Sequence, residues 1–322
     1  MAIGARGHLG LGKETTWGTE ATASRYLPIV SESITTDIEQ IISAAQKGII
    51  DEPASYSGLK THAGDIVLEV HPVSIGDILR SALDEPTSAQ YDSGPLAYQH
   101  EFIPRQDDFA TDCPVCPYTI EVYRDNGNAF QYKGAVVNTL NFSFGVGEKI
   151  LKATAGIIAK EQGSITKTSP SLETENPFTW DQATIKIATV ANSDLESFTI
   201  NLDNHLVGVP TLNATSVISR IYRDAARTVD ISAVFDFVDQ TQFDKFISGT
   251  EQAFEITFEG AEIETGHNYT LKIEMPKVRY TAFPINIGGS GRITCNVSGK
   301  AKYSTSDGYA VKITLINQET EY

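Results

Sequence analysis

The sequence predicts a mainly β protein made of two similar domains in tandem, each with one short α-helix. A strand followed by a short helix is indicated at residues 65–83 and again at residues 230–248. Elsewhere Val, Ile, Thr, Tyr and Phe alternate with polar residues and are interrupted by Gly, Asn and Asp, which is typical of strands joined by turns. Because apolar residues at helical spacing cover only about two turns in each copy, both helices are expected to be short.

The two copies extend on both sides of the strand–helix unit. Residues 33–39 correspond to residues 197–203, and residues 118–123 correspond to residues 254–259, where apolar residues occupy every second position. With the strand and the helix of the repeated unit counted separately, four segments occur in the same order, which predicts a tandem duplication. The last pair of corresponding segments is closer together in the sequence than the two strand–helix units are. The first copy is therefore expected to carry an insertion at about residues 84–117.

Each predicted helix begins with a Ser or Thr three residues before an Asp, namely Ser74 with Asp77 and Thr241 with Asp244. This is the spacing of a capping box, in which two side chains satisfy N–H groups at the start of a helix. We therefore expect Ser74 and Thr241 to cap the two helices.

The chain of 322 residues is long enough for two domains that each bury a core. Residues 162–177 are rich in Ser, Thr, Glu and Pro and lack periodicity, which predicts an interdomain linker. The expected organisation is an N-terminal arm at residues 1–23, a first domain at 24–161 and a second domain at 178–322.

The formal net charge of −16 is spread evenly along the chain. A chain without a basic cluster lacks the usual means of binding phosphates, so tight or sequence-specific nucleic-acid binding is disfavoured. The charge fits either an ordinary acidic surface that favours solubility or a surface past which a polyanion slides. The N-terminal residues contain no apolar signal-peptide region, and no apolar run has the length of a membrane span. We therefore expect synthesis in the cytoplasm and no membrane contact.

The motifs that could carry chemistry are weak. Cys113 and Cys116 have the spacing of a redox or zinc half-site, but Cys295 stands alone and the histidines do not occur at ligand spacing. A Pro-rich loop does not lower a thiol pKa as a helix N-terminus does, so inert thiols are the favoured interpretation. No phosphate-binding loop or nucleophile elbow occurs. The sequence therefore predicts no enzyme, no catalytic, cofactor-binding or metal-binding residue, and no cofactor.

The N-terminal segment is the other distinctive part of the chain. Residues 10–19 are rich in Gly and Thr and look too polar for a core strand, yet they contain Trp17. An indole is costly to leave in water, so Trp17 is expected to dock on a neighbouring surface. A partly disordered tail is the alternative.

Several short stretches carry a resemblance to a known family. Residues 12–19 are GKETTWGT, residues 27–34 are LPIVSESI, and the strand from residue 65 leads into IGDIL at residues 75–79. With these stretches, and with a strand-rich ending to each half, the chain resembles the tail tube proteins of long-tailed bacteriophages. The two endings are residues 136–144 and 278–287.

The resemblance implies tail-tube-type β-sandwich or barrel domains, each flanked by a short helix, that assemble into stacked rings around a channel for DNA. It implies a location in the virion tail. The implied partners are further copies of the chain, the tape measure protein, and tail terminator or baseplate proteins, while DNA passes without specific binding. Many members of the family have one such domain and form hexameric rings. This chain is expected to have two domains, so the resemblance leaves the number of subunits per ring open.

The predicted function is that of the major tail tube subunit, a structural virion protein. One alternative is a related ring at one end of the tube, such as a terminator or hub component. The other alternative is a non-viral β-sandwich module that binds carbohydrate. Such a module should present clustered exposed aromatic residues, whereas this chain has only two tryptophans, Trp17 and Trp180.

If each half is one tube domain, three chains supply six similar domains, which predicts a homotrimeric ring with approximate sixfold symmetry. Residues 43–63 are long and polar and predict a long loop between two strands, and residues 206–227 are its expected counterpart in the second half. The resemblance implies that this loop contacts the adjacent ring. The predicted inter-subunit contacts are Trp17, Lys47, Asp51 and Tyr56.

The channel is expected to be acidic or neutral, because an inward-facing Lys or Arg would attract phosphate. The predicted channel-lining residues are Asp37, Glu39, Glu69, Asp203 and Asp236. The choice of strands is inherited from the resemblance, and a solvated outer sheet face is the alternative location for these side chains.

Overall fold

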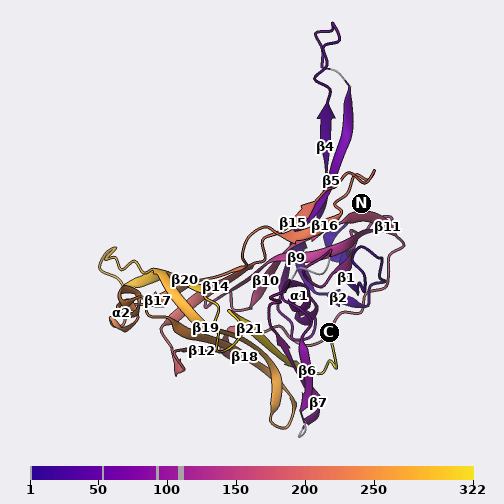
Figure 1. The fold of residues 1–322 in the computed structure, drawn as a ribbon. Coiled ribbons are helices and arrows are strands. Elements are labelled where there is room, and N and C mark those ends of the chain that lie inside the picture. Colours follow the sequence, from indigo (N-terminus) through magenta and orange to yellow (C-terminus); the bar gives the residue numbers. More distant parts are fainter. Residues whose placement is uncertain (1, 53, 92–93, 108–111) are drawn as a thin grey trace.

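The computed structural model describes residues 2–52, 54–91, 94–107 and 112–322. It is mainly β, with large antiparallel sheets and two short α-helices (Figure 1), which confirms the predicted fold class. None of the helices within these ranges is long and apolar enough to cross a membrane.

The first half contains a sheet in which β3 and β4 follow one edge of β5, and β5 is followed by β10 and β9. The strands are β3 (Ile29–Glu32), β4 (Thr35–Ile42), β5 (Ser55–Glu69), β9 (Ala129–Gly145) and β10 (Lys152–Ala159). Burial alternates along β10, where Ala153, Ala155 and Ile157 are buried and the residues between them are not. One face of this sheet therefore points into the core and the other points away from it.

A second sheet of the first half lies against helix α1 (Ile75–Ala82), and its strand order is β2–β1–β8–β9–β11. The added strands are β1 (His8–Lys13), β2 (Arg25–Leu27), β8 (Tyr118–Tyr123) and β11 (Glu161–Ile165). β9 belongs to both sheets and changes direction at Gly134, whose φ of +62° favours glycine. All eight residues of α1 are buried.

The second half repeats this arrangement with the strand order β14–β17–β20–β19, and β19 also pairs with β18 and β21. β18 pairs with β12, which pairs with β13. The strands are β12 (Ala183–Ile187), β13 (Val190–Ala191), β14 (Leu195–Asp203), β17 (Thr228–Asp236), β18 (Gln252–Glu264), β19 (His267–Ala282), β20 (Thr294–Ala301) and β21 (Lys312–Asn317). Helix α2 (Thr241–Ser248) follows β17 as α1 follows β5, but none of its residues is buried. Two short 3₁₀-helices, Gly4–Arg6 and Trp180–Gln182, complete these elements.

Backbone pairing joins the two halves. The C-terminal part of β9 pairs antiparallel with β14, with Leu140 opposite Leu202. The cores merge as well, because Phe144 of β9 packs edge-on against Phe258 of β18, with 5.0 Å between the ring centroids. One cluster of buried side chains runs through both halves. The domain boundaries inferred from the sequence stay a prediction.

The segment predicted to be an insertion, residues 84–117, contains a hairpin of β6 (Thr87–Tyr91) and β7 (Gly94–Phe102). β7 pairs with β21, so this hairpin extends the sheet of the other half. Near the start of β7, the Glu264 carboxylate accepts the N–H groups of Leu96 and Ala97. Residues 92–93 and 108–111 of the segment lie outside the described residues.

Both helices occur where the sequence predicts them, but the predicted capping boxes are wrong. The Ser74 hydroxyl donates to Glu173 at 2.5 Å and makes no cap bond to its own helix. Thr241 is the first helical residue, and its N–H donates to Asp239. At the start of each helix, the free backbone N–H groups are therefore accepted by a carboxylate outside the helix, Glu173 for α1 and Asp239 for α2.

The expectation that residues 10–19 are too polar for a core strand is wrong for their first part. β1 lies between β2 and β8, and its Leu9 and Leu11 are buried. The intervening glycines allow this position, because a Cβ on Gly12 would lie 2.5 Å from the Ala21 carbonyl oxygen. These glycines let the adjacent backbone segment of the same chain approach β1 closely. They do not indicate an exposed arm.

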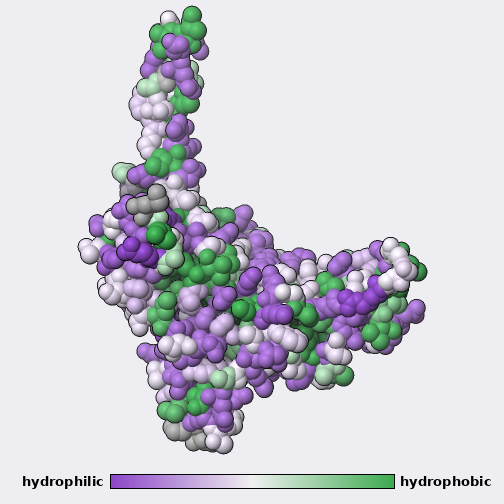
Figure 2. Space-filling model, turned by 180° about the vertical axis from the view of Figure 1, so that it is seen from behind, coloured by the Kyte–Doolittle hydropathy of each residue, from purple (hydrophilic) through white to green (hydrophobic). Residues whose placement is uncertain are grey.

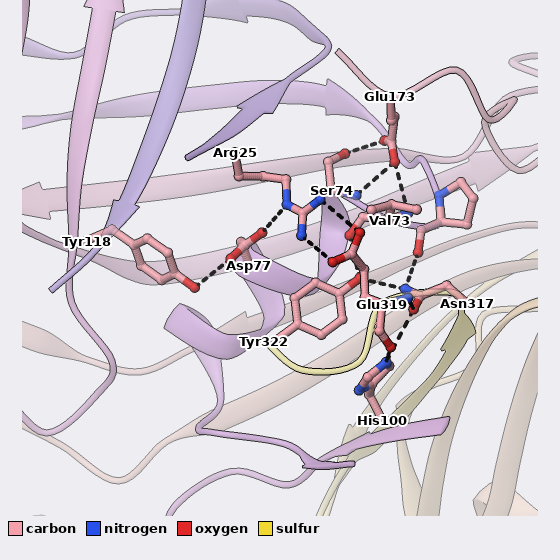
Figure 3. A network of polar contacts seen from close by, with 11 residues as sticks. Arg25, Val73, Ser74, Asp77, His100, Tyr118, Glu173, Asn317, Glu319 and Tyr322 are labelled. Atoms are coloured by element: carbon pink, nitrogen blue, oxygen red, sulfur yellow. Dashed lines mark hydrogen bonds and ion pairs between the residues drawn. The ribbon is translucent and has the colours of Figure 1, made fainter. Parts of the chain in front are cut away.

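A polar network ties the C-terminal segment to α1 (Figure 3). Arg25 of β2 donates from Nε to Asp77 at 3.1 Å and from Nη2 to Glu319 at 2.8 Å. The Tyr118 hydroxyl donates to the other Asp77 oxygen at 2.9 Å. Burial raises the pKa of Asp77, while Arg25 and Tyr118 oppose that shift. A buried carboxylate is tolerated only with such partners, so α1 is fixed to β2, β8 and the chain end together.

Tyr322 occupies the centre of this network. Its hydroxyl donates to the Val73 carbonyl at 2.7 Å and accepts from the Asn317 side chain at 2.5 Å. The ring lies so close to α1 that a Cβ on Gly76 would be 2.1 Å from it, so the helix needs glycine at this position. Burial raises the pKa of Tyr322 well above its usual value.

The imidazole of His100 on β7 is buried and hydrogen-bonded on both sides. Its Nε2–H donates to the Glu319 carbonyl at 3.0 Å, and Nδ1 accepts from the Ser88 hydroxyl at 2.7 Å, so both nitrogens are satisfied in the neutral form. Burial lowers the pKa of His100, and burial also lowers the pKa of His62. The stability that comes from keeping these groups neutral is present above the unfolded pKa of about 6.5 and is lost as the pH falls through the folded value.

We therefore expect the free energy of unfolding to fall as the pH is lowered from about 7.5 towards 5, in the window set by the unfolded histidine pKa. His100→Gln should make this fall shallower, whatever it does to the stability at neutral pH. The measurement is denaturant unfolding at several pH values. His267→Gln, which removes a half-buried imidazole near the β18–β19 turn, is the control. An unchanged slope in His100→Gln would contradict the assignment.

Candidate assembly and channel surfaces

The hairpin of β4 and β5 projects from the body of the molecule (Figures 1 and 2) and carries an unusual number of exposed apolar side chains. Ile49 is 60% exposed and Ile50 is fully exposed. The other exposed apolar residues on the hairpin are Ile38, Ile41, Ile42 and Tyr56. Exposed apolar side chains gathered on one projecting element mark an interaction site, so the hairpin is a candidate assembly surface.

The predicted contact residues Lys47, Asp51 and Tyr56 all lie on this hairpin and are exposed. The prediction of one long loop at residues 43–63 is wrong in its second part. Residues 43–52 and 54 lack strand structure, whereas β5 begins at residue 55 and pairs with β4. The first part of β5 leaves the body of the protein and needs no apolar face, so polar residues occur on both of its sides. The alternation of apolar and polar residues that predicts a strand is therefore absent there.

Trp17, the fourth predicted contact residue, is docked within its own chain. The indole N–H donates to the Gly134 carbonyl at 3.0 Å, and the Lys160 ammonium lies 4.3 Å from the ring centroid. A cation over an indole face is a favourable contact. The expectation that Trp17 docks on a surface agrees with this position, whereas its role between subunits stays a prediction.

The second-half counterpart predicted at residues 206–227 contains a small hairpin of β15 (Leu206–Val209) and β16 (Arg220–Arg223). It packs at the base of the long hairpin, where the Lys60 N–H donates to the Ser216 carbonyl at 2.7 Å. Leu206 and Ile221 join a small apolar cluster beneath it. The long hairpin is therefore supported at its base by the other half of the chain.

Four of the five predicted channel acids share one face of the sheet that joins the halves. Glu69 lies opposite Lys152, Asp203 lies opposite Thr139, and Asp236 lies opposite Thr294. Strand alternation and the cross-strand registers place these side chains, with Asp37, on the face turned away from the core.

Glu39 departs from this pattern. It lies at an irregularity in the β4–β5 register, and its carboxylate accepts the N–H of Leu59 at 3.2 Å. It therefore stabilises the hairpin locally, and its position on the channel wall stays a prediction.

The same face carries further charged residues that the sequence analysis did not single out. Asp65 and Asp230 lie on it by alternation within β5 and β17. Among its cations, Lys152 lies opposite Glu69, Lys300 lies opposite Asp230, and Arg292 pairs with Asp236 at 3.2 Å. Lys300 pairs with Asp230 at 2.9 Å. The period of two along each strand was the signal that would have found the two acids. The face is acidic on balance, with its cations next to acids.

The two neighbouring cysteines are buried, as expected from the sequence. Burial raises the pKa of Cys113 to about 12 and that of Cys116 to about 11, so the thiolate form is strongly disfavoured. Within the described residues, no group of three or more His, Cys, Asp or Glu side chains could hold a metal ion.

Comparison with protein families identifies a match to the phage tail tube protein family over residues 4–301. Comparison with curated proteins found no match. Since the family match covers nearly the whole chain, the chain belongs to the phage tail tube protein family, a family of structural proteins of the phage tail. The resemblance seen in the sequence is thereby confirmed.

Proposed function

We propose that this chain is the major tail tube subunit of a long-tailed phage and that its rings stack into a hollow tube through which DNA leaves the virion. The observation that carries the proposal is the exposed isoleucine hairpin on a chain whose two halves both fall within the tail tube family match. Burying that hairpin against another ring would remove its apolar surface from water. The further partners are the tape measure protein and the terminator or baseplate proteins, and synthesis takes place in the host cytoplasm.

We further propose a ring of three chains. The two halves have the same order of core strands, with a helix after the corresponding strand in each. Three chains would then supply six similar units in a closed ring, in which each contact is repeated and no sheet edge stays exposed.

The ring proposal predicts three chains per layer, with threefold true symmetry and approximate sixfold symmetry. Averaged images of the tube, or the native mass of single rings, measure this directly. Six chains per layer would contradict the trimer. Single rings that never lengthen would instead favour the alternative of a terminator or hub protein.

Stacking is expected to depend on the apolar tip of the long hairpin. The variant Ile41→Ser/Ile49→Ser/Ile50→Ser should stay folded, because exposed side chains contribute only about 0.5 kcal/mol each to stability. It should form soluble rings that no longer lengthen into tubes, as seen by negative-stain microscopy. Val190→Ser on β13, also an exposed apolar position at 69%, is the matched control and should form tubes. Normal tubes from the triple variant would show that another surface stacks the rings.

We propose that the acidic sheet face lines the channel. Thr199→Lys/Asp203→Lys should then make assembled tubes retain short DNA duplexes at low salt and release them as salt rises, because each inward lysine adds a phosphate contact. The control Asp244→Lys/Ser248→Lys makes the same change of charge at exposed positions of α2, the helix that packs on the core side of its sheet, and should retain none. Equal retention by both variants, or by neither, would place this face outside the channel.

A further inference from the structure

The two halves agree in strand order and also in their register irregularities. In the first half, the pairing of β3 with β5 slips between Ile29 and Ser31. In the second half, the pairing of β14 with β17 slips between Leu195 and Ser197. This common bulge makes Ser31 equivalent to Ser197. Counting onward from these two serines makes Asp37 equivalent to Asp203. The correspondence of residues 33–39 with residues 197–203 inferred from the sequence is therefore wrong by two positions.

A second shared irregularity aligns the strands at the other side of each half. β10 pairs Gly156 with Thr139, and the register slips before the next pair. β20 pairs Ser298 with Ala282, and the register slips at the corresponding place. Thr139 is therefore equivalent to Ala282. Bulges are local features of specific sequences, so two shared ones fix the alignment independently of residue identity.

This alignment can be applied to the contact that joins the halves. Within the chain, β14 pairs with β9 with Asp203 opposite Thr139. In this alignment β14 is equivalent to β3 and β4, and the C-terminal part of β9 is equivalent to the C-terminal end of β19. The contact equivalent to β9–β14 would therefore join the edge of β3 and β4 to the edge at the end of β19. The equivalent pair is Asp37 opposite Ala282.

Both of these edges lack a partner strand among the described residues. β3 and β4 pair with β5 on one side only. β18 accompanies β19 as far as Val278, and residues 283–288 belong to no strand. In the first half the equivalent residues of β9 are held as a strand by β10 and β14 together.

The burial patterns of the two edges match. In the derived register Ile34 meets Ile285, and Thr36 meets Phe283 on the same face; Ile34 and Phe283 are buried, and the other two are half-buried. The neighbours Asp37 and Ala282 are both exposed. A shift by one residue would place buried side chains opposite exposed ones, so the pairing specifies its own register.

The backbone groups also point the right way. The Ser33 N–H donates to the Asp65 carbonyl, so Ser33 faces β5 and its neighbours Ile34 and Thr36 direct their N–H and C=O groups to the open edge. By the same alternation, Ile285 would face the partner edge and Pro284 would face β20. The missing N–H of proline therefore does not interrupt the new ladder.

One side-chain clasp covers this edge in the isolated chain. The Glu32 carboxylate accepts the Ile34 N–H at 3.1 Å and pairs with Arg124 at 2.7 Å, and Arg124 also donates to the Ile34 carbonyl. Charged groups at an edge strand are a common protection against unwanted pairing. The Ile34 carbonyl also accepts the Tyr132 hydroxyl at 3.0 Å. An incoming strand would therefore take the Ile34 N–H from Glu32 and displace one of the two donors from the carbonyl.

We propose that the ring closes by β-sheet pairing between residues 282–287 of one chain and residues 32–37 of the next. The occupant of each open edge is thus a second copy of this chain, in the register with Asp37 opposite Ala282. This inference rests on the proposed ring. It makes the contact between chains an approximate copy of the β9–β14 contact within the chain.

The test is a disulfide across the proposed pair. In the variant Asp37→Cys/Ala282→Cys the Cβ atoms of the two cysteines are expected to lie about 5 Å apart across the interface, within reach of a disulfide. Assembled rings should become covalently linked on mild oxidation, and most of the chain should then migrate as a covalent trimer on a non-reducing denaturing gel. The three native cysteines are buried and do not compete.

The matched control is Thr35→Cys/Ala282→Cys, which uses an equally exposed residue two positions away on the same face. Its cysteines are expected to be about 7 Å apart or more, so it should cross-link poorly. Rings seen by microscopy without cross-links in the first variant, or with stronger cross-links in the control, would overturn the inference and leave the proposed function standing. Absence of rings from the unmodified chain would overturn the proposed function itself.

Discussion

The pairing of β9 with β14 is the constraint on which the rest of this structure depends. β9 serves both sheets of the first half and then continues as the neighbour of the second half. Without β14, the C-terminal part of β9 would be an open edge with Phe142 and Phe144 at its border. With it, Ile200 lies opposite Phe142 and the two cores become one. Since the halves share a ladder and a buried core, we expect them to unfold in one cooperative transition.

Much of this arrangement could be predicted because strand alternation is local. The period of two assigns Glu69, Asp203 and Asp236 to a polar face without knowledge of which strands are neighbours, and the structure brings them to one face. The two helices were predictable for the same reason, since apolar spacing in a short segment decides their existence. The family resemblance supplied the interpretation of that face, which no local pattern contains.

The rest depended on contacts between residues far apart in the sequence. Glu173 at Ser74 and Arg25 at Asp77 replace the capping pattern that the sequence suggested within the helix. β1 can be a core strand because its glycines let the backbone of residues 21–22 approach closely. From composition alone, the same glycines make the segment look too polar for the core. The hairpin of β6 and β7 pairs with β21, the last strand of the chain, where Ile313 lies opposite Phe102. No short window of sequence contains such a partner.

This acidic chain bears exposed apolar side chains and strand edges without a partner strand. Its charge and its contact surfaces therefore act in opposite directions on assembly. Its charge of −16 keeps copies apart in solution, while assembly requires contacts strong enough to overcome that repulsion. Apolar burial and backbone pairing are suited to this task, since neither depends on charge and both act only at contact distance. The Glu32–Arg124 clasp then has a physical role before assembly, because it satisfies an edge that would otherwise pair with any strand. Repulsion at long range with specific pairing at short range favours the one register in which apolar faces and backbone groups both match.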